Sequence, residues 1–369
     1  MHKEEHKPKR FMIAGGGTGG HIFPAIAIAN ALKKKNADAV FLFVGAKGKM
    51  EMEKVPKAGY EIVGLTIAGF NRSSLIKNIG LPFKLIKSFF ETASIVKKFQ
   101  PDAVIGVGGY SSFPVLRYAQ SKGIPTFIHE ANSFAGKTNM LLAKNATAVF
   151  TATEGMEKFF PTHKIEVTGN PVRLSIIESK PSREDAIRQF NLDPYKKVIF
   201  CVGGSLGALS INQALVSGLD KLEQEGIQLI WQTGIPFLEQ AKKASENRKG
   251  IWVGDFINNI EMAYAAADLV ISRSGAMSVA ELSLVGKPVI FVPYPHAAED
   301  HQTANAKKLS NANAAVLIAD HKTQSLLVDA AIELMKNEEK QKKMKNEMLH
   351  FATADADQKI AEAILKKIQ

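Results

Sequence analysis

The chain has 369 residues, 46% of them apolar, a formal charge of +11 and a single cysteine. No apolar run approaches the roughly 18 residues that a membrane span needs, and the lysine-rich start does not resemble a signal peptide. One cysteine excludes a disulfide framework, and Cys201 is expected to be buried inside a strand. We therefore expect a cytosolic globular protein of two domains with an anionic partner.

A glycine-rich turn follows the first predicted strand. The strand covers residues 10–14, the turn covers 15–21, and a helix is expected from about Pro24, which suits a first helical turn, to Lys34. Three glycines match the dinucleotide-binding pattern G-x-G-x-x-G, namely Gly15, Gly17 and Gly20. An NAD site also needs an acid at the end of the second strand, where this chain has Gly45-Ala-Lys47. NAD is therefore not an expected cofactor.

Two further predicted strands of the first half end in glycine or polar loops. Strand 103–107 precedes Gly108-Gly-Tyr110, and strand 125–128 precedes His129-Glu-Ala-Asn132. Each loop alone could be ordinary turn chemistry. Because the carboxyl ends of parallel strands meet at one edge of a sheet, the three loops together predict a ligand-binding edge.

Residues 72–98 form a segment that is both basic and apolar. It has one acid, Glu91, against six cations: Arg72, Lys77, Lys84, Lys87, Lys97 and Lys98. Its apolar residues are too many for one buried helical stripe, so some are expected to stay exposed. Exposed apolar side chains among lysines suit an anionic membrane surface, and the alternative is a packed helical pair with a solvated lysine face. Nucleic acid is not an expected partner, because no recognition helix or stacking platform accompanies the charge.

The second half repeats the order of strand, glycine loop and helix. Gly169-Asn-Pro-Val-Arg173 closes the first half, and the domain boundary is placed near Pro171. Strand 198–202 then precedes the glycine loop 203–210 and a helix, as strand 10–14 does in the first half. This repetition favours two α/β domains of similar build.

A strand, a tight turn and a helix are interpreted as a diphosphate site. The apolar strand 268–272 leads through a glycine into a helix that is expected to begin at Ala276 or Met277. The first amides of that helix would face a ligand with the positive end of the macrodipole. Glu281, about one turn further, could accept hydrogen bonds from a ribose. The alternative is that Ser278 and Glu281 only stabilise the helix start.

The next predicted strand, 289–292, delivers a polar loop to the same edge. The side chains of this loop comprise His296, Glu299, Asp300, His301, Gln302 and Asn305. Two consecutive strands with polar ends favour a sugar-nucleotide site. From Gln324 the chain is expected to be helical to its end. Asp355 and Asp357 fall at a helix start, and no metal site is expected there.

Together these motifs resemble those of the MurG family, bacterial enzymes that add N-acetylglucosamine (GlcNAc) to lipid I to make lipid II, the peptidoglycan precursor. The resemblance runs from about Lys9 to the C-terminus. The motifs that carry it are Gly15-Gly-Gly-Thr-Gly-Gly-His-Ile-Phe-Pro24, Gly108-Gly-Tyr110, His129-Glu-Ala-Asn132, Gly169-Asn-Pro-Val-Arg173, Gly203-Gly-Ser-Leu-Gly-Ala208, Arg273-Ser-Gly-Ala-Met-Ser-Val-Ala-Glu281, and Gln302 with Asn305.

The resemblance implies a GT-B glycosyltransferase, an α/β protein of two Rossmann-like doubly wound domains facing a cleft. An N-terminal acceptor and membrane-associating domain would cover residues 9–171, and a C-terminal UDP-GlcNAc-binding domain would cover 172–352. A last helix, at about 353–369, would pack back on the first domain.

The resemblance also implies roles for individual residues. Glu281 would bind the ribose, and the backbone near Ile257 would bind the uracil. The diphosphate would be surrounded by Arg173, Ser205, Ala276, Met277 and Ser278, with Val279 and Ala280 beside them. Gln302 and Asn305 would read the sugar hydroxyls, and Asn132 would reach across the cleft. The donor sugar and the acceptor diphosphate would both meet Thr18, Gly19 and Gly20, with Gly108, Gly109 and Tyr110 on the acceptor side.

Two positions depart from the family pattern. Ala131 and Leu206 stand where the family often has glutamine. The missing glutamine side chain at either place would weaken donor or acceptor binding, unless the neighbouring backbone suffices.

An inverting transfer to the C4 hydroxyl of N-acetylmuramic acid (MurNAc) needs a base and a positive group for the departing UDP. His21 is the first candidate base, because an imidazole can accept a proton near neutrality, and Glu130 is the second. The alternative is that His21 only bonds backbone or phosphate. The helix start at Ala276, with Arg173, could stabilise the leaving diphosphate in place of a metal, so no cofactor is expected.

UDP-GlcNAc and lipid I are the implied substrates, and cell-wall synthesis proteins are candidate partners. The implied location is peripheral, on the cytoplasmic face of the cell membrane, with residues 72–98 against anionic lipid. The alternatives are a UDP-GlcNAc 2-epimerase of the same fold, a glycolipid synthase acting on diacylglycerol, and a non-catalytic nucleotide-sugar or acidic-lipid binding module. The segment 72–98 disfavours the epimerase, because its substrate is soluble.

Overall fold

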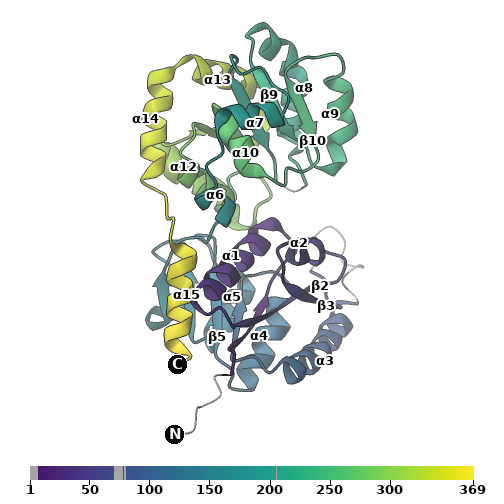
Figure 1. The fold of residues 1–369 in the computed structure, drawn as a ribbon, viewed down its shortest axis with the longest axis vertical. Coiled ribbons are helices and arrows are strands. Elements are labelled where there is room, and N and C mark those ends of the chain that lie inside the picture. Colours follow the sequence, from purple (N-terminus) through teal and green to yellow (C-terminus); the bar gives the residue numbers. More distant parts are fainter. Residues whose placement is uncertain (1–6, 70–77, 79, 205) are drawn as a thin grey trace. The chain divides into compact units, whose positions relative to one another are not determined.

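The computed structural model describes residues 7–69, 78, 80–204 and 206–369, and its contacts divide the chain into two compact units (Figure 1). The first unit contains the chain up to Arg173 together with Asp355–Gln369, and the second contains Leu174–Ala354. The last segment of the chain therefore belongs to the first unit.

The first unit is built on a parallel sheet that has seven strands within the described residues, in the order β3-β2-β1-β4-β5-β6-β7. The order reverses between β1 and β4, and such a switch point is where open α/β sheets bind ligands. The strands are β1 (Arg10–Ala14), β2 (Val40–Ala46), β3 (Glu61–Leu65), β4 (Ala103–Gly106), β5 (Thr126–Glu130), β6 (Ala148–Thr151) and β7 (Ile165–Val167).

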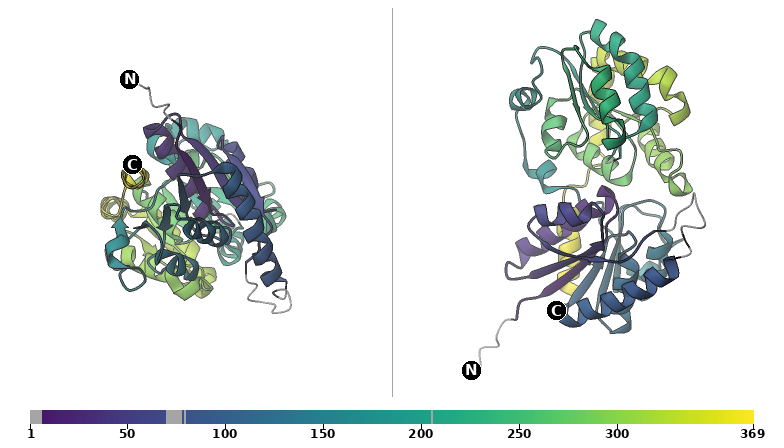
Figure 2. Two further views of the ribbon diagram at one scale, coloured as in Figure 1. Left: turned by 90° about the horizontal axis from the view of Figure 1, so that it is seen from below. Right: turned by 90° about the vertical axis from the view of Figure 1, so that its right-hand side faces the viewer.

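Helices cover both faces of this sheet (Figures 1 and 2). On one face α1 and α15 pack together over Phe11, Ile13 and Phe127. On the other face α3 and α4 pack over Met12, Val104 and Ile128. The helices of the unit are α1 (Gly19–Lys35), α2 (Glu51–Lys57), α3 (Leu81–Phe99), α4 (Ser112–Ser121), α5 (Lys137–Ala143) and α15 (Ala356–Lys367).

Two predicted boundaries in the first unit were wrong. Helix α1 begins at Gly19 and not at Pro24, because the Thr18 carbonyl already accepts from the His21 and Ile22 amides, at 3.1 and 3.2 Å. His21 therefore lies in the first turn of a helix. Strand β5 continues through Glu130, because its pairing with β6 extends to the end of that strand.

The second unit repeats the same topology. Within its described residues a parallel sheet of six strands has the order β10-β9-β8-β11-β12-β13, with the reversal between β8 and β11. The strands are β8 (Val198–Val202), β9 (Gln228–Gln232), β10 (Ile251–Gly254), β11 (Leu269–Ser272), β12 (Val289–Phe291) and β13 (Val316–Leu317). The expected α/β class with two doubly wound sheets is confirmed.

The helices of the second unit also lie on both faces of their sheet. They are α6 (Leu174–Glu178), α7 (Arg183–Gln189), α8 (Leu209–Gln224), α9 (Leu238–Ala244), α10 (Ile260–Ala266), α11 (Ala276–Val285), α12 (His301–Asn311), α13 (Thr323–Lys336) and α14 (Glu338–Leu349). Helices α8 and α13 pack on the face that contains Cys201, and α10 and α11 pack on the opposite face. Cys201 is fully buried, as predicted.

Candidate active site

The loops after β1 and β4 touch each other at the switch point of the first sheet. Gly109 has a φ of +89°, and a Cβ built on it would lie 2.5 Å from the Gly16 carbonyl oxygen. The Ser112 hydroxyl lies 2.9 Å from the carbonyl oxygens of both Ala14 and Gly108. Glycine is needed here because two backbones approach closely, and the contact brings Gly15–His21 and Gly108–Tyr110 together.

A buried carboxylate that no sequence motif marks holds the first glycine loop. Glu51, at the start of α2, is only 1% exposed. Its Oε2 accepts a hydrogen bond from the Gly17 amide at 2.8 Å, and its Oε1 accepts from the Ala46 amide at 2.9 Å. In the sequence Glu51 looks like an ordinary acid of a first helical turn, so only the packing reveals its role.

His21 is oriented by the same loop. Its Nδ1 lies 3.0 Å from the Gly16 carbonyl oxygen and 3.4 Å from the Thr18 hydroxyl. Because a carbonyl can only accept, Nδ1 carries the proton and Nε2 keeps its lone pair. A Cβ on Gly108 would lie 2.8 Å from Nε2, so the glycine leaves that nitrogen unobstructed.

Burial lowers the pKa of His21 from its usual value, and three weaker effects oppose it. These are the hydrogen bond to Gly16 and the nearby charges of Glu130 and Glu51. Neighbouring His129, on β5, is only 1% exposed, and burial lowers its pKa to about 4. Both shifts favour the neutral form of the imidazole.

Glu130 organises the loop that follows β5. Its Oε1 accepts from the Asn132 backbone amide at 3.1 Å and from the Asn132 side chain at 3.3 Å. Its Oε2 accepts from the Gly136 amide at 3.0 Å and from the Asn139 side chain at 2.9 Å. Four donors thus surround a buried carboxylate, which fixes the position of Asn132.

Two further predicted residues lie at this edge of the first unit. The Arg173 guanidinium carbon stands 4.0 Å from the centroid of the Phe23 ring, on the first turns of α1. The half-exposed ring of Tyr110 packs against Gly69, where a side chain would clash with it. At Ala131, the backbone carbonyl accepts from the Asn170 side chain at 3.1 Å, so the loop is held there without a glutamine side chain.

In the second unit α11 begins at Ala276, as predicted, and ends before Gly286. Gly275 is its N-cap, and the first helical hydrogen bond runs from the Val279 amide to the Gly275 carbonyl at 2.9 Å. The amides of Ala276, Met277 and Ser278 precede that bond, so they have no carbonyl partner within the helix. They lie directly after β11, at the switch point of the second sheet.

Residues from α10, α11 and α12 surround the start of α11. Glu281 is 4% exposed, and the Tyr264 hydroxyl lies 3.5 Å from its Oε2. Asn305 donates to the Ser274 carbonyl at 3.1 Å. The Gln302 Oε1 accepts from the Tyr294 amide at 3.0 Å, and its Nε2 would lie 3.9 Å from a Cβ on Gly275. The structure thus brings Glu281, Gln302 and Asn305 to one helix start.

Gln232 is a second site residue that no sequence motif marks. From the end of β9 it donates to the Gly204 carbonyl at 3.1 Å and accepts from the Ile257 amide at 2.9 Å. It therefore links the glycine loop after β8 to the loop proposed for uracil. Ser205 lies outside the described residues, and the neighbouring Leu206 side chain is exposed.

Arg273 holds together the loops that surround the start of α11. Its guanidinium donates to the carbonyl oxygens of Val292 and Pro293, at 3.1 and 3.0 Å, and pairs with Asp320 at 2.6 Å. These bonds tie the loop after β11 to the loop after β12. Arg273 therefore has a structural role, because its guanidinium joins these two loops.

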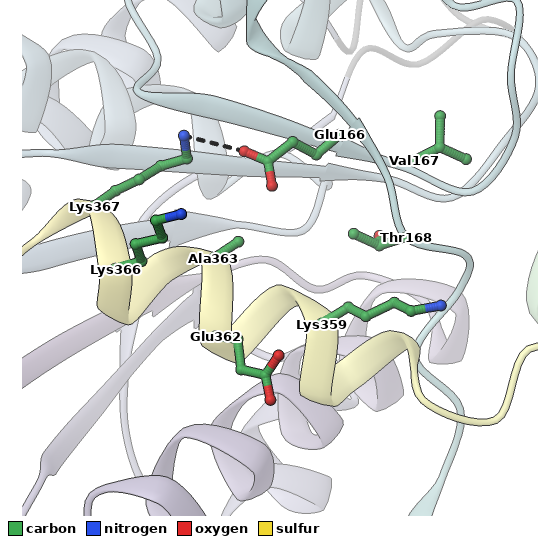
Figure 3. Close-up of a pocket in the computed structure, with 8 residues that line it drawn as sticks. All are labelled: Glu166, Val167, Thr168, Lys359, Glu362, Ala363, Lys366 and Lys367. Atoms are coloured by element: carbon green, nitrogen blue, oxygen red, sulfur yellow. Dashed lines mark ion pairs between the residues drawn. The ribbon is translucent and has the colours of Figure 1, made fainter.

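A groove of about 510 Å³ between β7 and α15 is separate from these residues (Figure 3). Its charged lining is largely paired: Lys367 with Glu166 at 3.1 Å, Glu362 with Lys35 at 2.7 Å, and Lys359 with Asp355 at 3.0 Å. None of the site residues predicted from the sequence lines it. Within the described ranges, no three His, Cys, Asp or Glu side chains are grouped as metal ligands.

The chain matches two family models. The glycosyltransferase family 28 N-terminal domain matches residues 11–151, and the family 28 C-terminal domain matches residues 198–361. These matches cover the glycine loops after β1 and β8 and the start of α11.

Relatives are similar over the whole length. A Bacteroides fragilis protein, named UDP-N-acetylglucosamine–N-acetylmuramyl-(pentapeptide) pyrophosphoryl-undecaprenol N-acetylglucosamine transferase, is 48% identical, with 100% of each chain covered. The crystal structure of Acinetobacter baumannii MurG is 32% identical, with a TM-score of 0.73 over 97% of this chain and 100% of that one. A UDP-GlcNAc 2-epimerase from Neisseria meningitidis shares the fold alone, at 17% identity and a TM-score of 0.68, with 97% of this chain and 100% of that one covered. The chain therefore belongs to glycosyltransferase family 28 and, within it, to the MurG family of N-acetylglucosamine transferases.

Proposed function

We propose that this chain transfers GlcNAc from UDP-GlcNAc to the C4 hydroxyl of MurNAc in undecaprenyl-diphospho-MurNAc-pentapeptide, converting lipid I into lipid II for peptidoglycan synthesis. The observation that carries the proposal is the 48% identity to a transferase of that name over its full length. The fold alone would not suffice, since a 2-epimerase shares it.

The donor would bind at the second sheet. The amides of Ala276, Met277 and Ser278 would face the diphosphate, and Arg173 would add its fixed charge. Glu281 would bind the ribose, and the Ile257 backbone, held by Gln232, would bind the uracil. Gln302 and Asn305 would bind the sugar hydroxyls, because both already reach the start of α11.

His21 would act as the base. The MurNAc O4 proton moves to the Nε2 lone pair, O4 bonds to C1 of GlcNAc, and the C1–O bond to UDP breaks with its electrons on the diphosphate. Attack on the face opposite the leaving group inverts C1. Glu130 is left as a positioning residue for Asn132, because four donors already occupy its oxygens.

A metal would not be required, because the first-turn amides of α11 and Arg173 meet the charge that develops on the departing diphosphate. The position of the Ala276, Met277 and Ser278 amides directly after β11 supports this proposal. Removal of divalent ions is therefore expected to leave the transfer rate unchanged.

The outer face of α3 would contact the membrane. Phe83 and Phe90 are 75% and 74% exposed, and Ile86, one turn from each, is 56% exposed. The lone acid, Glu91, turns inward to accept from Thr66 at 2.7 Å and to pair with Lys47 at 3.2 Å. Apolar burial and attraction of the lysines to anionic headgroups would add on this face, placing the enzyme on the cytoplasmic side of the membrane.

The predicted membrane segment is described only in part. Residues 72–77 and 79 lie outside the described residues, whereas 78 and 80–98 lie within them. The expectation that some apolar side chains stay exposed is confirmed on α3. Among the described helices, none combines the length and apolar character needed to cross a bilayer.

The test is transfer of labelled sugar from UDP-GlcNAc to a short-chain lipid I analogue, with and without a chelator, while free sugar and epimer are followed in parallel. Disaccharide-lipid formation at the same rate in both samples is expected. Epimer or free sugar without transfer would contradict the proposed reaction, and a rate that falls with the chelator would contradict metal-free catalysis.

A further inference from the structure

One peptide unit stands between Glu51 and His21. The Gly16 carbonyl lies 3.0 Å from His21 Nδ1, and the Gly17 amide donates to Glu51 Oε2 at 2.8 Å. This carbonyl and this amide belong to the same peptide group. The carboxylate, the peptide and the imidazole therefore form one chain of hydrogen bonds.

Glu51 is held firmly in this arrangement. Its other oxygen accepts from the Ala46 amide at 2.9 Å, and its side chain is buried. A Cβ at Gly45 would lie 2.5 Å from Glu51 Cγ, and a Cβ at Gly16 would clash with the carboxylate itself. The two glycines thus make the space that the carboxylate fills, so it cannot rotate away from the loop.

We infer that Glu51 is a positioning residue for the transfer reaction, acting on His21 through the Gly16–Gly17 peptide. A carboxylate that accepts from a peptide N–H polarises that peptide, and its carbonyl becomes a stronger acceptor. The stronger acceptor keeps the proton on His21 Nδ1 and leaves Nε2 available to take the proton of the acceptor hydroxyl. The inference rests on the proposed role of His21 as the base.

The charges around His21 set the expected pH response. Glu51 on α2 and Glu130 on β5 both raise the pKa of His21 against the larger lowering by burial, and His129 on β5 is neutral near pH 7. Loss of the Glu51 charge should lower the pKa of His21 further. Since the base must be unprotonated, the acidic limb of the rate profile should then move to lower pH.

The variant Glu51→Gln tests the inference, because it keeps the shape of the side chain and removes the charge. We expect kcat on the pH plateau to fall about tenfold to a hundredfold, less than the roughly 10²- to 10⁴-fold cost of losing a general base altogether, with KM for UDP-GlcNAc little changed. The matched control is Glu53→Gln on the same helix, where the exposed carboxylate pairs with Lys57 and Lys54. This control should retain the wild-type rate and pH profile.

A second measurement reports the tautomer directly. In protein labelled with ¹⁵N-histidine, the His21 signals, assigned by their loss in His21→Gln, should show a protonated Nδ1 and an unprotonated Nε2. Glu51→Gln should mix the two tautomers. A wild-type tautomer in this variant would overturn the inference, whether the rate falls or not, because Glu51 would then serve only the fold.

The two measurements separate this inference from the proposed function. If the wild-type protein transfers no sugar, the proposed function fails, and the NMR comparison still decides whether Glu51 controls His21. If Glu51→Gln does not fold, Glu51→Asp replaces it, with the charge kept and the reach shortened by one methylene. Tautomer mixing is again expected, and an unchanged His21 spectrum would overturn the inference.

Discussion

His21 combines a fixed proton position with a lowered pKa. The Gly16 carbonyl holds the proton on Nδ1, and burial disfavours the charged ring. Such an imidazole can accept a proton at neutral pH even though no carboxylate bonds directly to its ring.

Substituting His21→Ala should lower kcat about 10²- to 10⁴-fold, the usual contribution of general-base catalysis, while donor affinity stays near the wild-type value. In the wild-type enzyme the acidic limb of kcat/KM should lie below pH 6.5, the ordinary histidine value, because the pKa of His21 is lowered. Steady-state rates between pH 4.5 and 8 measure both effects. Unchanged turnover in the variant would exclude His21 as the base.

Glu281 offers a test on the donor side. Glu281→Ala should weaken UDP-GlcNAc binding by about 1–3 kcal/mol, because a charge-assisted hydrogen bond to the ribose is lost. Titration calorimetry with the intact nucleotide sugar measures this change. Glu239→Ala removes an exposed carboxylate of the same unit, paired with Lys242, and serves as the control. Equal affinities of the two variants for UDP-GlcNAc would show that Glu281 does not bind the donor.

Helix α3 is unusual because its exposed face carries large apolar side chains and its buried face includes polar ones. Its buried residues are Ser88, Thr92, Val96 and Phe99, whereas Phe83, Ile86 and Phe90 are exposed together with lysines. The periodicity could show an excess of apolar residues. It could not show which of these residues become buried, because that depends on how closely β3 and α4 pack against α3.

The double variant Phe83→Ser and Phe90→Ser should lose most of its binding to anionic vesicles in a flotation assay. Leu326→Ser, an exposed apolar position on α13, should bind like the wild-type protein and is the matched control. Wild-type protein should float less with neutral vesicles. Indifference to lipid charge would contradict the electrostatic part of the proposal, and binding by the double variant would contradict the apolar part.

At the scale of the whole molecule, buried His129 should make stability depend on pH. Its pKa is about 4 in the folded protein and near 6.5 in the unfolded chain. Between these values the unfolded chain binds a proton that the folded protein does not, so stability falls as the pH is lowered. The loss amounts to at most about 3 kcal/mol.

Thermal unfolding at pH 6.5 and 4.5 measures this loss as a drop in Tm. The drop should be smaller in His129→Gln, which has no titrating ring, than in the wild-type protein. His163→Gln, at an exposed histidine of the same unit, should keep the full drop. Identical drops in all three proteins would show that His129 does not control the pH dependence.

The order of strand, glycine loop and helix, repeated in both halves, was enough to predict two α/β domains of similar build, and the resemblance to the MurG family implied that both sheets are doubly wound. It also predicted α11, because an apolar run, a glycine and a helical spacing are local signals. The start of α1 was mispredicted because proline was read as a first-turn residue, whereas the turn had already formed at the Thr18 carbonyl. The end of β5 was mispredicted because strand length depends on pairing with β6.

The sequence by itself determined the α/β class, the glycine loops that follow the strands and the resemblance to the family, since these depend on patterns between neighbouring residues. The tertiary structure decided which polar groups hold those loops. Glu51 lies 34 residues from Gly17, and Gln232 lies 25 residues from Ile257. No local pattern marks such contacts, because they form only when separate strands bring their ends to one edge of a sheet.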